Sequence, residues 1–368
     1  MKKQTIITAL LALIAHCAFA VAPDSLKKDL EDYDYLVSFV EKNYAPFGAI
    51  MQKGYKGEYK SMKKQIRAQL RKGETNLEKA AIDYALWFYS QFDRHIGVMT
   101  EAFGMAQAKI YNEAFLKMDS TLATLTPDDV EYAPKPVSCK VDSLTWLIRV
   151  PSCSLDSHEW TKNALQQFDE SDCENLIIDV RMNEGGSDAA WNKYYDILYD
   201  HPDKPYISWF RNTSENRNQN NWKTYAKGFI ATCEASKKKF LKNFEWTGDT
   251  GRKPIMRIRR AAILVDILTV SAGESIVDFA KKHSNRAKVY GRSNTLGSNL
   301  TGNVGEGFLP NSKIKFYYAT TVDSGFYEKD FSEGLGIAPD VIIPLPLPRK
   351  LTDNIDEWVL WVAEDLKR

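Results

Sequence analysis

Residues 269–274 read TVSAGE and stand between a predicted buried strand and a predicted amphipathic helix. The preceding residues 261–267, AAILVDI, are apolar and β-branched apart from one acid, which is typical of a strand buried in a parallel sheet. The following residues 274–283, ESIVDFAKKH, place their apolar side chains at helical spacing. Ser271 is therefore predicted to lie at a strand-to-helix turn, where free backbone N–H groups and the helix dipole favour a negative charge.

A serine at this turn has two interpretations. Its hydroxyl can simply cap the helix, which is the common role of serine at a helix start. It can also act as a nucleophile, because the free N–H groups would stabilise the oxyanion that forms when a carbonyl is attacked. The choice between them depends on the other motifs of the chain.

Three further segments accompany the turn. Residues 176–187, LIIDVRMNEGGS, form a predicted strand that ends in an Asn-Glu-Gly-Gly turn, and residues 333–346 read EGLGIAPDVIIPLP. Upstream, residues 92–98 read FDRHIGV. In this order the segments resemble the motifs of the C-terminal-processing (tail-specific) serine proteases, and the residues 92–98 resemble an element of the tricorn-core branch of that family.

The resemblance implies an α/β fold with a crotonase/ClpP-like core and a mostly parallel sheet, preceded by an N-terminal helical domain. The pattern of the chain agrees with this fold class. Predicted strands and helices alternate through its second half, as in α/β proteins, while its first part carries long apolar stripes at helical spacing.

The N-terminal pattern and the resemblance together divide the chain into three parts. We expect a signal peptide at residues 1–20, an N-terminal helical domain at 21–105 and an α/β catalytic domain at 136–368. Tail-specific proteases usually carry a peptide-binding PDZ module, but too few residues separate Thr100 from Ser143 to form one. The chain thus resembles the tricorn-core branch without a PDZ module.

The nucleophile and its base follow from the resemblance. Ser271 matches the nucleophile of the family, and it needs a base within hydrogen-bond reach. Ser298 stands where many relatives carry a lysine base, so a serine–lysine pair is not expected. His95 matches the histidine of the tricorn-like branch and is the predicted general base.

The group that orients His95 is less well defined by the sequence. Glu333 matches the glutamate that serves this purpose in the tricorn core, where a serine just before the histidine makes the connection. Here Arg94 occupies that serine position. The sequence leaves open whether Arg94 pairs with Glu333, and whether Asp93 orients His95 instead.

Backbone groups are expected to bind the oxyanion. The resemblance assigns this role to Gly185 or Gly186 together with Ala272, which follows the nucleophile. Asp179 and Arg181 match the Asp and Arg of the family's strand motif, and we expect them to form a buried structural ion pair with no catalytic part.

The sequence therefore predicts a secreted serine peptidase that hydrolyses peptide bonds through an acyl-enzyme on Ser271, with His95 as general base. Its partner would be a peptide or protein substrate, and neither a metal nor an organic cofactor is expected. The alternative is a non-catalytic ligand- or peptide-binding protein on the same fold. Composition does not separate the two, but a formal net charge of +1 gives no electrostatic basis for binding nucleic acid.

The N-terminus indicates export. Lys2 and Lys3 precede an apolar stretch and the small residues Ala18 and Ala20, which is the pattern of a secretory signal peptide cleaved after Ala20. A secreted or periplasmic protein is expected, since no other segment is long and apolar enough to span a bilayer. A lipoprotein anchored at Cys17 is the less favoured alternative.

Four cysteines remain after such a cleavage, and an even number in an oxidising compartment permits two disulfides. Several pairings are open. Cys139 with Cys153 is the favoured one, because a short hairpin between them could bring them together.

Overall fold

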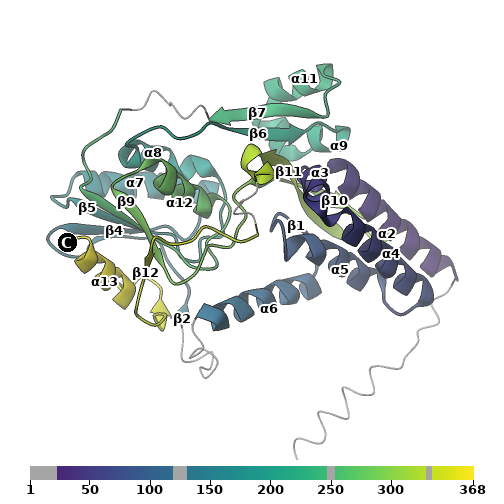
Figure 1. Ribbon diagram of the computed structural model, residues 1–368, viewed down its shortest axis with the longest axis horizontal. Helices are drawn as coiled ribbons and strands as arrows, with labels where there is room; N and C mark the ends of the chain where they lie inside the picture. The colour runs from purple at the N-terminus through teal and green to yellow at the C-terminus, as the bar shows by residue number, and fades with distance from the viewer. Residues whose placement is uncertain (1–22, 119–130, 247–252, 329–333) are drawn as a thin grey trace, which may run out of the picture.

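The computed structural model describes residues 23–118, 131–246, 253–328 and 334–368. Within these residues the chain forms two main sheets flanked by helices, and a small parallel sheet of β2 (Glu131–Tyr132) and β13 (Lys350–Leu351) (Figure 1). The predicted signal peptide and Glu333 lie outside the described residues.

The larger sheet has six strands in the order β12-β9-β8-β5-β4-β3. Every neighbouring pair is parallel except β3 with β4, which confirms the predicted α/β class with a mostly parallel sheet. The strands are β3 (Val137–Lys140), β4 (Thr145–Arg149), β5 (Asn175–Asp179), β8 (Arg260–Leu264), β9 (Ala287–Gly291) and β12 (Val341–Ile342).

Helices cover both faces of this sheet. Ile148, Ile178 and Ile263 point to one face and pack against three helices, while Leu147 and Ile177 point to the other. This alternation arises because successive side chains of a strand face opposite sides. The first face is covered by α7 (His158–Asp169), α8 (Asn192–Leu198) and α12 (Ala272–His283), and the second by α13 (Glu357–Asp365).

The second sheet is antiparallel throughout and has β11 at its centre. β11 pairs with β1, β6 and β10, and β7 extends the sheet beyond β6. Three short helices, α9 (Ser214–Arg217), α10 (Asn220–Tyr225) and α11 (Lys227–Ala235), connect β6 to β7. The strands are β1 (Ile96–Val98), β6 (Tyr206–Arg211), β7 (Phe240–Trp246), β10 (Thr301–Phe308) and β11 (Lys315–Asp323).

The N-terminal helices form one core with this second sheet. Phe39 makes edge-to-face ring contacts with Phe316 and Tyr318 of β11, and β1 carries the chain from the helices into the sheet. The predicted helical character of the N-terminal part is confirmed. Its helices are α2 (Pro23–Asn43), α3 (Phe47–Ile50), the π-helical turn η2 (Met51–Tyr55), α4 (Lys56–Lys72), α5 (Leu77–Tyr89) and α6 (Glu101–Met118).

A buried ion cluster ties the six-stranded sheet to the C-terminal segment. Asp179 accepts hydrogen bonds from both Arg149 and Arg181 at 2.7 Å, and Asp356 binds the same two guanidinium groups. All four side chains are almost completely buried. The predicted Asp179–Arg181 pair is therefore confirmed, although each residue has a second partner that the motif did not indicate.

The predicted disulfide is wrong. Cys139, Cys153 and the two remaining cysteines of the described chain are all free thiols. In the β3–β4 hairpin Cys139 lies opposite Leu147, so Cys153 lies beyond the end of the paired strands, where its sulfur contacts Asn183. None of the described helices is long and apolar enough to cross a membrane.

Candidate active site

Ser271 lies in the turn that joins β8 to α12. Its backbone has φ 55° and ψ −123°, a conformation that residues other than glycine rarely adopt. Gly185 packs closely against this turn, since a Cβ on that glycine would lie only 2.8 Å from the Cβ of Ser271. Strained strand-to-helix turns of this kind are known to expose a nucleophilic serine.

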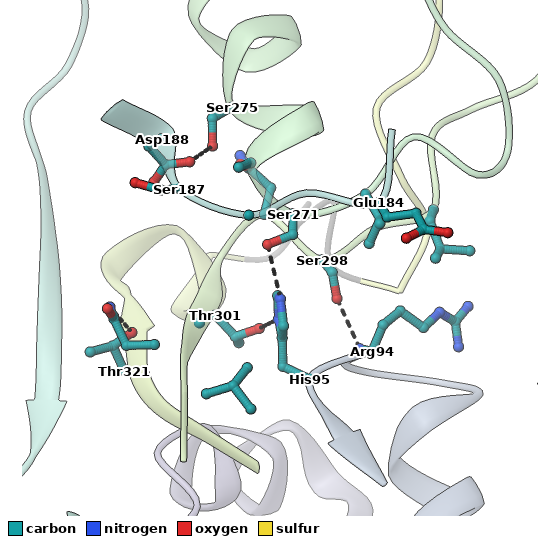
Figure 2. Close-up of a pocket in the computed structure, with 18 of the residues that line it drawn as sticks. Arg94, His95, Glu184, Ser187, Asp188, Ser271, Ser275, Ser298, Thr301 and Thr321 are labelled. Atoms are coloured by element: carbon teal, nitrogen blue, oxygen red, sulfur yellow. Dashed lines mark hydrogen bonds between the residues drawn. The ribbon is translucent and has the colours of Figure 1, made fainter. Parts of the chain in front are cut away.

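His95 faces Ser271 from the second sheet. It directly precedes β1, and its Nε2 lies 3.1 Å from Ser271 Oγ (Figure 2). On the other side of the ring, Nδ1 lies 3.0 Å from the hydroxyl of Thr301, the first residue of β10. Since β1 and β10 both pair with β11, one sheet fixes the positions of both residues.

Thr301 connects His95 to Asp93. The Thr301 hydroxyl donates to Asp93 Oδ1 at 2.7 Å, so its oxygen is available to accept Nδ1–H of His95. This assignment, made from the hydrogen-bond network, leaves Nε2 as the acceptor for the hydroxyl of Ser271. Asp93 Oδ1 itself lies 3.3 Å from His95 Nδ1. The side chains thus form a Ser–His–Asp arrangement.

Asp93 is fully buried, but its carboxylate accepts hydrogen bonds from several protein groups. Its oxygens accept hydrogen bonds from Tyr44 and Thr301 at 2.7 Å each, from the His95 backbone N–H at 2.8 Å, and from Ser298 at 3.5 Å. Burial alone would raise the pKa of Asp93, but hydrogen bonds and charge attraction from His95, with help from Thr301, hold it below its usual value. The carboxylate is therefore ionised beside the imidazole.

Arg94 turns away from His95, as Figure 2 shows. Its guanidinium carbon lies 5.0 Å from the ring centre of Tyr89, and its backbone N–H donates to Ser298 Oγ at 2.9 Å. Ser298, at the position expected for a lysine base, thus stabilises the loop that contains His95 through this hydrogen bond. The orienting role expected for Glu333 stays a prediction, because that residue lies outside the described chain.

The predicted oxyanion donors lie side by side. Gly185 and Gly186 follow β5, which is the neighbour of β8 in the sheet, so their loop meets the Ser271 turn. The N–H of Gly185 donates to Asn183 Oδ1 at 2.8 Å. No acceptor within the described residues binds the N–H of Gly186 or of Ala272. The last two groups are therefore available to an oxyanion, whereas Gly185 supports the loop.

Glu274 is a buried acid of α12 that sequence reasoning did not single out. Burial raises its pKa, and the hydrogen bonds that it accepts partly oppose this shift. By binding these groups it holds the segment after β9 against the nucleophile turn. Its donors are the backbone N–H groups of Ser271, Gly297 and Ser298 and the hydroxyl of Thr295.

These residues open onto a pocket of about 740 Å³ that both sheets line. This volume suits a segment of peptide. At one end Asp188 accepts a hydrogen bond from Ser275 at 2.8 Å and Asp323 stands nearby in the lining. Asp188 is exposed and Asp323 is half-buried, yet the surrounding walls partly desolvate both carboxyl groups. This raises the pKa of Asp188 and raises that of Asp323 to about 7. Among the described residues, no group of three or more His, Cys, Asp and Glu side chains is placed to hold a metal ion.

Comparison with known proteins agrees with this geometry. Residues 145–343 match the model of peptidase family S41, and the match spans more than half of the chain. No curated protein matches the sequence closely enough to serve as a relative.

Solved structures share the fold at low identity. Mature CPAF complexed with lactacystin is 14% identical with a TM-score of 0.56, covering 93% of this chain and 98% of that one. A proposed peptidase from Parabacteroides merdae is 16% identical with a TM-score of 0.51, covering 86% of this chain and 89% of that one. The photosystem II D1 C-terminal processing protease is also similar, at 17% identity and a TM-score of 0.36 over 58% of this chain and 46% of that one. Because the family model covers residues 145–343, more than half of the sequence, the chain belongs to peptidase family S41, and it is a serine-type peptidase.

Proposed function

We propose that the protein hydrolyses peptide bonds through an acyl-enzyme on Ser271, with His95 as general base. The observation that carries this proposal is the 3.1 Å contact between Ser271 Oγ and His95 Nε2, at a serine whose backbone is forced into a strained turn. A serine hydroxyl is a weak nucleophile at neutral pH, so it needs a base at this distance.

The first step is acylation. Ser271 Oγ attacks the carbonyl carbon of the peptide while its proton passes to His95 Nε2, and the carbonyl oxygen becomes an oxyanion. The free N–H groups of Gly186 and Ala272 bind this oxyanion. When the C–N bond breaks, His95 returns the proton to the leaving amine. Water then attacks the acyl-enzyme with the same base, and the acid product leaves.

Thr301 and Asp93 act on His95 and not on the substrate. Together they hold the imidazole with its Nε2 toward the serine. When the ring becomes protonated, the ionised carboxylate of Asp93 stabilises its positive charge, because the two lie 3.3 Å apart in a buried site. Asp93 therefore takes the position of the orienting acid in a serine–histidine–acid triad.

A fluorophosphonate probe tests this proposal directly, because it labels only an activated serine. The purified protein should be labelled, Ser271→Ala should abolish the labelling, and His95→Ala should slow it by about 10²- to 10⁴-fold. Ser275→Ala, which alters a neighbouring serine of α12, is the matched control and should retain labelling. A folded protein that the probe does not label would instead favour a binding protein on the same fold.

We also propose that the protein acts outside the cytoplasm, on the strength of its N-terminal sequence pattern. N-terminal sequencing of the protein from its native host should find Val21 as the first residue. If the N-terminal residue is instead a lipid-modified Cys17, the protein is anchored to a membrane and the proposed cleavage after Ala20 is wrong.

A further inference from the structure

Arg94 lies at one end of the active-site pocket and has no counter-ion among the residues that the structure describes. Within the described residues, its buried Nε and Nη1 atoms have no hydrogen-bond acceptor. The ring of Tyr89 lies beneath the guanidinium at 5.0 Å, which steadies the group but does not neutralise it. Because a buried donor without an acceptor costs free energy, an anion bound at Arg94 would be stabilised there.

The surroundings of Arg94 favour a ligand of opposite charge. Among the described residues that line the pocket, Arg94 is the only lysine or arginine. Tyr111, hydrogen-bonded to Tyr89, and Gln107 complete a polar wall beside it. The nearby Glu184 is exposed and forms no ion pair with it within the described chain. This end of the pocket thus offers the guanidinium of Arg94, the exposed acid Glu184 that is not paired with it within the described chain, and several neutral hydrogen-bonding groups.

Arg94 and two acids of the pocket lining, Asp188 and Asp323, lie at different ends of the pocket. Arg94 and Asp188 lie on opposite sides of Ser271 in Figure 2, and Asp323 is close enough to Asp188 for charge repulsion between the two. Charges placed in this way repel a carboxylate from one end and attract it to the other. A peptide with an acidic group is therefore oriented before it reacts.

The reaction chemistry indicates which part of the substrate meets Arg94. The leaving amine takes its proton from His95 Nε2, so the leaving part of the peptide must pass on the histidine's side of Ser271. Arg94 is bonded to His95 in the chain and lines the pocket on that side. The acyl part must instead place its carbonyl oxygen at the N–H groups of Gly186 and Ala272.

We propose that Arg94 binds a carboxylate of the substrate on the leaving-group side of the scissile bond, and so makes the peptidase selective for peptides that are acidic there. This inference rests on the proposed peptidase function. The guanidinium suits the task, because its fork of N–H donors matches the two oxygens of a carboxylate. The carboxylate is either the free C-terminus of a short leaving peptide or an aspartate or glutamate side chain near the cleaved bond.

The test uses one randomised pool of hexapeptides, synthesised with free C-termini and again with C-terminal amides. Cleavage of both pools by the full-length mature protein is followed by mass spectrometry, and the preference is the ratio of kcat/KM for acid and amide forms. A second arm takes the cleaved sequences and replaces each Asp or Glu after the cut by Asn or Gln. We expect one of these carboxylates to be favoured by about 10- to 100-fold. The arm that shows the preference identifies the source.

Variants assign the preference to the guanidinium. Arg94→Gln should bring the ratio close to one, and Arg94→Lys should restore part of it. Arg211→Gln is the matched control, because Arg211 also lies over an aromatic ring, that of Phe240 at 4.9 Å, but does not line the pocket. Glu333→Gln shows whether this acid competes for Arg94, in which case the preference should rise. A preference that survives in Arg94→Gln, or is absent from the wild type, would overturn the inference.

The outcomes for the function and for the inference are distinct. A protein that the fluorophosphonate labels, that cleaves the acid and amide pools equally and that shows no preference in the Asp/Glu arm keeps its proposed function and loses the inference. If no peptide is cleaved, the carboxylate site is tested by measuring how the two pools bind to the Ser271→Ala variant. Enrichment of C-terminal acids, or of peptides that contain Asp or Glu, that disappears in Ser271→Ala/Arg94→Gln supports the carboxylate site. Equal binding of both pools with no enrichment of Asp or Glu in either contradicts it.

Discussion

Asp93 Oδ1 lies 3.3 Å from His95 Nδ1, although a single residue separates the two in the chain. The backbone explains this proximity. The N–H of His95 donates to the same carboxylate oxygen at 2.8 Å, which curls the side chain back as in an Asx turn. The carboxylate then lies beside the imidazole, and Thr301 bridges the two. One three-residue segment therefore supplies both the proposed base and the acid that orients it.

Removing the charge of Asp93 should damage catalysis. In Asp93→Asn the side-chain amide would donate toward Nδ1 and favour the tautomer with its proton on Nε2, which cannot accept the proton of Ser271. We expect kcat/KM to fall by about 10²- to 10⁴-fold, measured on any peptide that the wild type cleaves. Thermal unfolding of the variant checks that the loss of activity is not a loss of fold, since Asp93 also binds Tyr44.

Glu333→Gln is the companion variant for this comparison. If Asp93 orients His95, this change should lower kcat/KM far less than Asp93→Asn does. A larger loss in Glu333→Gln would restore the glutamate to the orienting role that the sequence resemblance assigned to it.

The bridging hydroxyl of Thr301 can be removed with little change of shape. Thr301→Val should lower kcat by about tenfold or more, because His95 Nδ1 then loses its nearest acceptor at 3.0 Å. KM should change little, since the hydroxyl contacts the base and not the substrate. Thr301→Ser keeps the hydroxyl and should recover most of the activity. Equal activity in the valine and serine variants would show that Asp93 orients the ring without a bridge.

The contrast between Ser271 and Thr301 shows what could be predicted from the sequence. The position of Ser271 followed from a local pattern, a buried strand run and then a helical run, and the structure places it at that turn beside His95. Thr301 has no such pattern. It contacts His95, 206 residues away in the chain, because β1 and β10 pair with the same strand. The register of this antiparallel pairing cannot be predicted from either segment alone.

The error at Cys153 has the same origin. The predicted hairpin after Cys139 exists, but the register of its two strands decides which residues face one another. Cys139 pairs with Leu147, six residues before Cys153 in the chain. The resemblance located Asp179 and Arg181 correctly, yet Asp356 comes from the C-terminal segment, and only the folded chain brings it to them.

Removing one charge from the buried ion cluster should lower the stability of the protein strongly. Asp179→Asn leaves Arg149 and Arg181 short of a counter-ion in the interior, and we expect the free energy of unfolding to fall by about 3–5 kcal/mol. Urea unfolding measures this change. Asp34→Asn is the control, because its ion pair with Arg67 is exposed and should contribute about 0–1 kcal/mol. Similar losses in the two variants would contradict the importance of burial.

Asp323 should make stability depend on pH. Desolvation in the pocket wall raises its pKa to about 7, and repulsion from Asp188 and Asp278 adds to the shift, while a hydrogen bond from Ser208 opposes it. Since the folded protein binds this proton more tightly than the unfolded chain, whose carboxyl has an ordinary pKa of 3.8, the folded state is favoured at low pH. The advantage is complete below about pH 4 and is lost as the pH rises through about 7.

Asp323→Asn removes this dependence and provides the measurement. Above pH 7 the variant should be more stable than the wild type by about 1–3 kcal/mol, less than the full pKa shift implies because the side chain keeps some contact with solvent. Near pH 4 the two proteins should unfold at closely similar urea concentrations. Ser208→Ala should move the transition to higher pH, since it removes a hydrogen bond that lowers the pKa of Asp323. A constant difference between Asp323→Asn and the wild type from pH 4 to pH 8 would show that Asp323 is ionised throughout this range, and that the pocket wall does not desolvate it.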